Sequence, residues 1–154
     1  MYQDEWTKAV HAYVADNKEK IEQVIVCAAD EQISRDLHAE IVRNSEEILE
    51  MLELPYRVVN VCGGDLGRGQ VHKYDIQAWM PSRNNWGETH SASRFHDFQA
   101  RRLDMRYRDA DGKVKVCHTL NNTVVASPRI LIPVLENHQQ ADGSIRIPDA
   151  LVPY

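Results

Sequence analysis

The sequence predicts an α+β fold, built on a mainly antiparallel sheet of five or six strands with helices packed on one side. Apolar residues spaced three and four apart mark amphipathic helices. The motif Asp109-Ala110-Asp111-Gly112 is a hairpin signal and favours antiparallel pairing of the segments on either side of it. β-branched, apolar segments of strand length recur along the chain, at residues 21–29, 56–62, 74–80 and 114–120.

The composition is that of one globular domain covering residues 1–154. The chain has 154 residues, of which 43% are hydrophobic and 27% charged, enough apolar material for a core. The formal net charge of −5 gives no support to a surface that is basic throughout and built for nucleic acid. We expect no membrane partner, because every apolar run is too short for a bilayer and the acidic N-terminus is unlike a secretory signal.

The three cysteines, Cys27, Cys62 and Cys117, are widely separated and lie in strand-like surroundings. We expect buried free thiols and a cytoplasmic protein, since an odd number of scattered cysteines in apolar surroundings is not a disulfide framework. The sequence contains neither a CxxC pair nor a Cys/His spacing typical of zinc.

The first third of the chain predicts helix, strand, helix and strand in that order. Apolar residues at helical spacing predict a short helix over residues 4–17. The apolar run 21–29 predicts a buried strand, after which Asp30 caps a long helix over residues 31–53. A Leu-Pro pair ends that helix, and residues 56–62 follow as the second strand.

The glycine-rich segment 63–69 has neither GxGxxG nor Walker spacing, so we favour a tight, mobile turn over a phosphate-binding loop. Residues 74–80 alternate in polarity and predict a strand with two different faces, followed by a polar loop over residues 81–87.

Two polar clusters come next. Glu88 and Ser91 lie three residues apart, so a carboxylate and a hydroxyl reach one Mg²⁺ if the backbone turns between them. Such pairs are common, and alone this one is a weak signal. Residues 98–108 contain four arginines, which fit either a basic strand near a polyanion or a sheet edge with solvated charges.

The most informative stretch is residues 119–139, where a polar run leads into an amphipathic helix. Ser127 is predicted as the N-cap and a proline as the first helical residue, so Arg129 leaves from the first turn. Free N–H groups and the helix dipole allow a phosphate or carboxylate site there. Local chemistry alone nevertheless favours a plain capped helix with a solvated arginine, because many helices begin this way. Pro133 predicts a kink, and residues 145–148 predict a brief last strand.

Five segments carry a resemblance to a known family: LPYRVVNVCGGDLG (54–67), KYDIQAWMPSR (73–83), ETHSASRFHDFQARR (88–102), HTLNNTVVASPRILIPVLENHQ (118–139) and DGSIRIPDALVPY (142–154). Over residues 22–154 the chain resembles the C-terminal half of the catalytic domain of seryl-tRNA synthetase, a class II aminoacyl-tRNA synthetase. The last three segments are specific, because their order and spacing are hard to reach by chance. The pattern TLNNT…PR…LEN resembles class II motif 3.

The resemblance implies a class II fold and a two-step chemistry with ATP and Mg²⁺ as cofactors. In the family, serine attacks the α-phosphate of ATP to give seryl-adenylate, and the seryl group then passes to tRNA(Ser). Arg129 matches the motif 3 arginine, which holds ATP phosphate and offsets charge in the transition state. Glu88 and Ser91 match the Mg²⁺/ATP ligands. Three further positions match the family's serine pocket, in which a carboxylate faces the amino group and hydrogen bonds select the hydroxyl: Glu22, Asn121 and Thr123.

The chain also departs from the family pattern. Upstream of Lys20 the family has an Arg-x-His-Gln-Phe run whose phenylalanine stacks on adenine, whereas residues 14–18 here read VADNK. Residues 1–19 are instead predicted as a divergent N-terminal helix, and motif 1, the rest of motif 2 and the tRNA-binding arm find no match. Gln77 and Gly63 stand where the family usually has Glu and Thr.

Three functional hypotheses follow. The chain is a portion of a serine–tRNA ligase that needs a complementary synthetase chain and does not aminoacylate tRNA alone. Alternatively, it is a non-catalytic, truncated paralogue that binds ATP or an adenylate. In the third hypothesis it is a module that associates with a synthetase or with itself, since a missing half leaves exposed strand edges.

Overall fold

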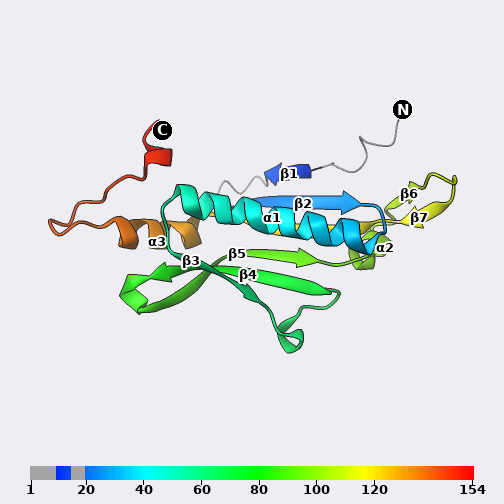
Figure 1. Ribbon diagram of the computed structural model, residues 1–154, viewed down its shortest axis with the longest axis horizontal. Coiled ribbons are helices and arrows are strands. Elements are labelled where there is room, and N and C mark those ends of the chain that lie inside the picture. The colour runs from blue at the N-terminus through cyan, green and yellow to red at the C-terminus, as the bar shows by residue number, and fades with distance from the viewer. Residues whose placement is uncertain (1–9, 15–19) are drawn as a thin grey trace.

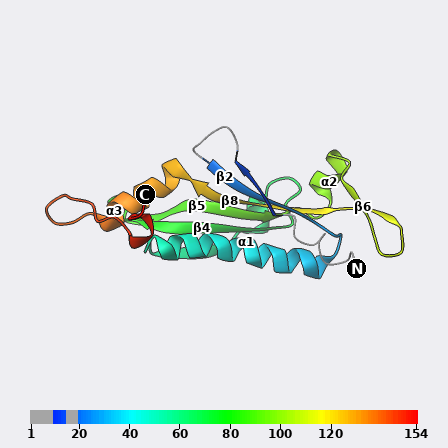
Figure 2. The same ribbon diagram turned by 90° about the horizontal axis from the view of Figure 1, so that it is seen from above.

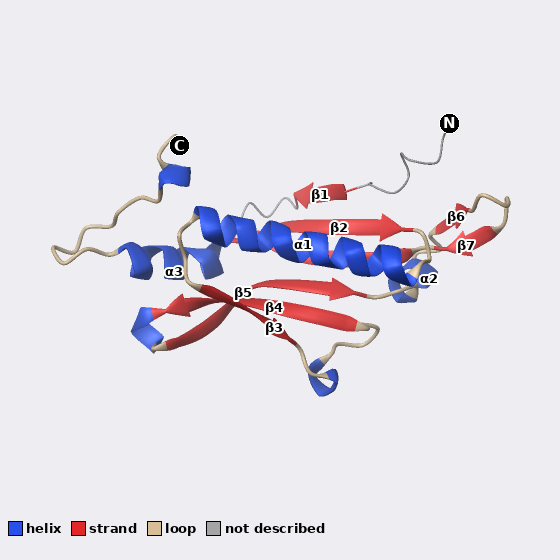
Figure 3. Ribbon diagram, in the orientation of Figure 1, coloured by secondary structure: helices blue, strands red, loops and turns tan. Residues whose placement is uncertain are grey.

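The computed structural model, in which residues 10–14 and 20–154 are described, has one large antiparallel sheet with helices beside it (Figures 1 and 3). Its six strands lie in the order β1-β2-β8-β5-β4-β3, and β6 and β7 form a separate two-stranded hairpin. The elements are β1 (Val10–Val14), β2 (Lys20–Cys27), α1 (Glu31–Met51), β3 (Tyr56–Asn60), η1 (Gly63–Asp65), β4 (His72–Met80), η2 (Pro81–Arg83), β5 (Asn85–Arg94), α2 (Phe98–Arg102), β6 (Arg106–Arg108), β7 (Val114–Val116), β8 (His118–Ala126), α3 (Ser127–His138) and η3 (Asp149–Leu151).

The long helix α1 covers one face of the sheet (Figure 2) and forms the core with it. Asp30 begins the helix as predicted, since its Oδ1 accepts a hydrogen bond of 2.9 Å from the Ile33 N–H. The apolar stripe of the helix packs on the central strands, where burial of such side chains contributes about 1.5–3 kcal/mol each. The fully buried residues of this core include Ile41 and Leu49 of the helix and Ile76 and Leu120 of the sheet. The opposite face of the sheet is left open along its middle.

Helix α3 lies at the end of the sheet where α1 finishes. Its Glu136 binds Ser82 of η2, and its Asn137 Nδ2 donates to the Trp79 carbonyl at 2.9 Å. The N-cap is Ala126 and not Ser127 as predicted, because β8 runs into the helix without a loop and its last residue is already extended. The helix continues through Pro133 to His138.

The predicted helix over residues 4–17 is wrong where the structure describes it. Val10–Val14 form strand β1, which pairs antiparallel with β2, and the remainder of that prediction lies outside the described residues. A valine- and tyrosine-rich segment favours strand, and pairing satisfies backbone groups along the edge of β2 that a helix would leave unpaired.

Two further predictions are corrected. Residues 98–108 are not one strand: Phe98–Arg102 form helix α2, in which Arg101 reaches back four residues to Asp97. Residues 145–148 form no strand, and only Ile145 makes a single bridge to Gln139. Among the helices that the structure describes, none is long and apolar enough to cross a membrane.

Candidate active site

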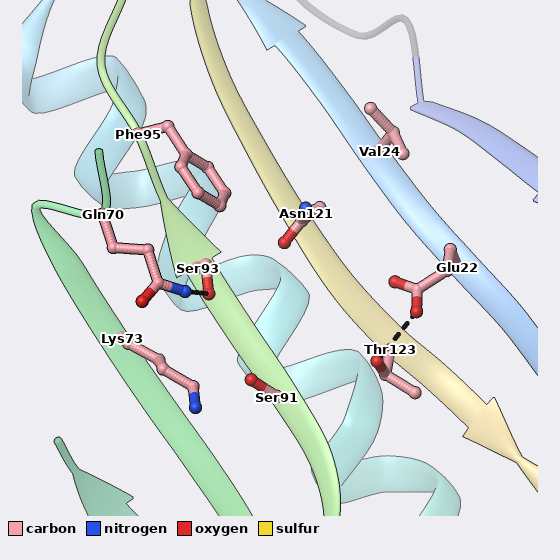
Figure 4. A pocket seen from close by; sticks show the side chains of 9 residues that line it. All are labelled: Glu22, Val24, Gln70, Lys73, Ser91, Ser93, Phe95, Asn121 and Thr123. Atoms are coloured by element: carbon pink, nitrogen blue, oxygen red, sulfur yellow. Dashed lines mark hydrogen bonds between the residues drawn. The ribbon is translucent and has the colours of Figure 1, made fainter. Parts of the chain in front are cut away.

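A pocket of about 510 Å³ opens on the face of the sheet opposite α1 (Figure 4). Side chains from β2, β8, β5 and β4 converge on it across the sheet. The residues that line it are Glu22, Val24, Gln70, Lys73, Ser91, Ser93, Phe95, Asn121 and Thr123. Seven of these nine side chains carry oxygen or nitrogen groups, which suit a polar, zwitterionic ligand.

Strand alternation decides which side chains of the polar run in β8 reach the pocket. Asn121 and Thr123 line it, whereas Asn122 points to the helix side and is fully buried. Asn122 Nδ2 donates to the Ile41 carbonyl at 2.8 Å and to Ser45 Oγ at 2.7 Å. The two outer residues therefore belong to the site, and the middle one fastens the sheet to α1.

Glu22 and Thr123 face each other across β2 and β8, as the register of these strands requires. Thr123 Oγ1 donates a hydrogen bond of 2.9 Å to Glu22 Oε1 (Figure 4). The contact joins residues 101 positions apart in the sequence. It places a carboxylate beside a hydroxyl, an arrangement suited to a ligand with an ammonium group and a hydroxyl.

Glu88 and Ser91 share the pocket face of the sheet, although the backbone does not turn between them as the prediction required. Both lie in the extended strand β5, where residues three apart normally point to opposite faces. A β-bulge corrects this, because Gln77 pairs with Glu88 while Ile76 pairs with His90, leaving Thr89 as the extra residue. Glu88 and Ser91 thus lie opposite Gln77 and Asp75, which share one face of β4.

Arg129 is brought to Glu88 and not into the pocket lining. Its Nη1 donates to Glu88 Oε1 at 3.0 Å, and the two side chains are 56% and 39% exposed. This pair lies beyond Ser91 along β5, at the end of the site nearest α3. An exposed pair of this kind adds little to stability.

Two side-chain oxygen donors on this face are of the kind that a magnesium ion prefers. Glu88 and Ser91 supply hard oxygens on one face, as Mg²⁺ prefers. Among the described residues no group of three or more His, Cys, Asp or Glu side chains is placed to hold a metal ion.

Sequence reasoning missed five pocket residues, Val24, Gln70, Lys73, Ser93 and Phe95. Lys73 lies 2.9 Å from Asp75 Oδ1, and both side chains are largely buried. Gln70 Nε2 donates to Ser93 Oγ at 2.8 Å. Period-two alternation from Ser91 and Asp75 pointed to Ser93 and Lys73, but only strand pairing brings the two together.

The four arginines of residues 98–108 are mostly committed locally. Arg101 pairs with Asp97, and Arg106 with Asp104. Arg102 covers the Phe98 ring, with 3.6 Å between its guanidinium carbon and the ring centre. Solvated, paired charge describes this surface better than a free polycationic strand.

The antiparallel sheet and the β8 strand that runs directly into α3 agree with the class II aminoacyl-tRNA synthetase fold that the sequence predicts. The family of the tRNA synthetase class II core domain (G, H, P, S and T) matches residues 17–138. The chain therefore belongs to this class II synthetase family.

Within the class, the relatives are serine–tRNA ligases. The chain is 53% identical over 135 residues to that of Deinococcus radiodurans and 49% identical over 136 residues to that of Pyrococcus furiosus, 88% of this chain in each case. A crystal structure of seryl-tRNA synthetase from Pyrococcus horikoshii complexed with ATP matches it with a TM-score of 0.83 at 48% identity. A serine–tRNA ligase structure from Naegleria fowleri in complex with AMP matches with a TM-score of 0.80 at 38% identity.

These comparisons confirm the predicted fold class and the resemblance to seryl-tRNA synthetase. The chain spans about a third of the length of the curated relatives, 32% and 30% for the two ligases above. Both solved structures likewise match over 88% of this chain, which is 30% and 28% of their own lengths.

Proposed function

We propose that this chain forms the serine-binding wall and one phosphate contact of a seryl-tRNA synthetase active site. The observation that carries the proposal is the Glu22–Thr123 pair inside the pocket, with 2.9 Å between Thr123 Oγ1 and Glu22 Oε1. Glu22 receives the α-ammonium group of serine, and Thr123 and Asn121 hydrogen-bond its polar groups. A site built to pair a hydroxyl rejects analogues that lack one, because its own polar groups would stay unpaired.

Arg129 and Glu88 mark the nucleotide end of this site. When ATP binds, Arg129 holds a phosphate oxygen and offsets the charge that develops during adenylation. Glu88 and Ser91 would hold a Mg²⁺ ion beside the phosphates, and the ion would supply further charge neutralisation there. Support comes from the ATP that is bound in the Pyrococcus horikoshii relative.

The 154-residue polypeptide by itself binds a seryl-adenylate but does not aminoacylate tRNA at a useful rate. Residues 14–18 provide no aromatic side chain where the family stacks one on adenine. Loss of a base stack costs about 1–3 kcal/mol, and loss of a charged phosphate contact costs a similar amount. A complementary synthetase chain would supply both, together with contacts to tRNA(Ser).

Serine-dependent exchange of pyrophosphate into ATP tests this proposal on the purified chain, with Arg129→Ala as the control variant. We expect exchange close to the level without serine in both proteins. Robust exchange that Arg129→Ala abolishes would contradict the proposal, because the chain would then carry a complete adenylation site.

A second function, association with a synthetase chain or with a second copy, is favoured by the outer side of α3. Leu131, Ile132 and Leu135 are 54%, 43% and 43% exposed there, an apolar surface that lies close to Arg129. Light scattering across a concentration series tests it. A monomer at every concentration, with or without an added synthetase chain, counts against this function.

A further inference from the structure

The pocket is ordered along the strands in successive cross-strand rows. Glu88 and Gln77 oppose each other in the row nearest Arg129. The next row contains the Glu22–Thr123 pair. Ser91 of β5 and Asp75 of β4 oppose each other in this same row. Two residues further, Val24, Asn121, Ser93 and Lys73 oppose one another in turn across four strands. Successive rows on one face are about 7 Å apart.

This order gives a bound amino acid a direction. The proposed function places the carboxyl group, which reacts with a phosphate, towards Arg129 and the ammonium group at Glu22. The side chain then points away from Arg129, into the row of Asn121 and Ser93. What closes that row therefore limits the side chain that the pocket accepts.

Gln70 lies across the row and is held at both ends of its amide. Its Nε2 donates to Ser93 Oγ at 2.8 Å, and its Oε1 accepts from the Gly67 N–H (Figure 4 shows the first contact). The Gln70 N–H also donates to the Gly67 carbonyl at 3.0 Å, so the turn is closed from both sides. A long side chain with its amide fixed in this way keeps one position, and its entropy is already lost before a ligand binds.

The glycine-rich segment anchors this turn to the protein. Gly69 has φ +88°, and a Cβ there would overlap the Phe98 ring. The ring is in turn covered by Arg102. The turn is therefore seated on α2, which gives the segment a structural purpose that its sequence alone did not reveal.

We propose that Gln70 is a specificity-determining residue, whose amide, fixed between Gly67 and Ser93, ends the pocket and restricts the substrate to a short hydroxy amino acid. The neighbouring Lys73–Asp75 ion pair, with 2.9 Å between Nζ and Oδ1, runs from the end row back to the row of Ser91 and makes this side of the pocket unfavourable for a longer apolar side chain. Such a side chain would displace water from these two charges and offer no hydrogen bond in its place. The inference rests on the proposed function, which sets the direction of the substrate.

Calorimetric binding of two non-hydrolysable probes to the 154-residue chain tests the inference. The probes are the N-acylsulfamoyl adenosines of serine and of homoserine, which has one more methylene group. We expect the wild-type chain to prefer the seryl probe, and Gln70→Ala to lower that preference roughly tenfold, the effect of one methylene group in a pocket. Gln70→Glu should keep most of it, because its oxygens accept from both the Gly67 N–H and the Ser93 hydroxyl.

Gln140→Ala, an exposed glutamine outside the pocket, should behave as wild type. Gln70→Asn, which is too short to span the same distance, provides a second test if Gln70→Ala does not fold. An unchanged preference in a folded Gln70→Ala or Gln70→Asn overturns the inference and leaves the proposed function intact. Failure of the wild-type chain to bind the seryl probe overturns the proposed function, and the inference with it.

Discussion

At the residue scale, Asn122 shows how one polar residue holds the core while its two neighbours face the pocket. It is fully buried and donates to both Ile41 and Ser45 of α1. We expect Asn122→Ala to lower the free energy of unfolding by about 2 kcal/mol, since Ser45 loses a buried partner and a small cavity opens. Urea denaturation measures this.

Asn121→Ala is the matched control, because the same change is made one residue away on the pocket face. It should change the unfolding free energy by less than about 1 kcal/mol. Equal destabilisation by the two variants would contradict the division between the core and pocket faces.

His90 predicts a dependence of stability on pH. It is 1% exposed, and burial lowers its pKa from 6.5 to about 4. Between these values the unfolded chain binds a proton that the folded chain does not, so stability falls as the pH is lowered from 6.5 towards 4. The shift is worth at most about 3 kcal/mol.

Thermal unfolding followed from pH 7 to pH 4 measures this effect, and His90→Gln should make the decline shallower over that range. The separate loss below pH 4.5, where Glu31 and Glu50 with pKa values of about 2 begin to protonate in the unfolded chain, should persist. An unchanged slope between pH 6.5 and 4 in His90→Gln would contradict the assignment to His90.

The local chemistry of single residues predicted less of the site than did the order and spacing of the segments that resemble seryl-tRNA synthetase. The sequence around Arg129 favoured a solvated arginine over an anion site, whereas the structure pairs this arginine with Glu88, 41 positions away. The Glu22–Thr123 contact likewise depends on strand pairing over a long separation. Neither partner could be deduced from spacing, because a pairing register is set by the whole sheet.

At the element scale, the most consequential feature is the bulge in β5. Periodicity places Glu88 and Ser91 on opposite faces of a regular strand, and one extra residue at Thr89 reverses that. Helix α1 was predictable because its apolar pattern is long and Asp30 caps it. Strands β2, β3 and β4 were predictable because each is rich in strand-forming residues. The prediction for residues 10–14 was wrong because apolar spacing in a short segment fits either structure, and pairing with β2 decides between them.

The turn that precedes β4 gives a prediction at this scale. Gly69→Ala should destabilise the chain by more than about 1 kcal/mol, because φ is +88° and the new Cβ meets the Phe98 ring. Gly64→Ala, in the same glycine-rich segment, is the control, since a Cβ there would meet nothing within 4 Å. Its unfolding free energy in urea should stay within about 0.5 kcal/mol of wild type. Similar losses in both variants would argue against a turn seated on α2.

At the scale of the whole molecule, the sheet separates two tasks. One face packs against α1 and forms the core with it. The other face carries the pocket, in which residues from four strands meet. The fold class was predictable because strand patterns and turn signals agree along most of the chain. The end wall of the pocket was not predictable from the sequence, because Gln70 follows a glycine-rich segment without a recognisable binding motif.

The central claim is that this face binds seryl-adenylate through Glu22 at one end and Arg129 at the other. Isothermal titration of the chain with the seryl sulfamoyl-adenosine probe tests it most directly, alongside Glu22→Gln, Arg129→Ala and two controls on the outer side of α1, Glu40→Gln and Arg43→Ala. We predict saturable one-to-one binding that Glu22→Gln and Arg129→Ala each weaken roughly tenfold or more, while both controls bind as wild type. Absence of binding by the wild-type chain, or wild-type affinity in the two site variants, would contradict the claim.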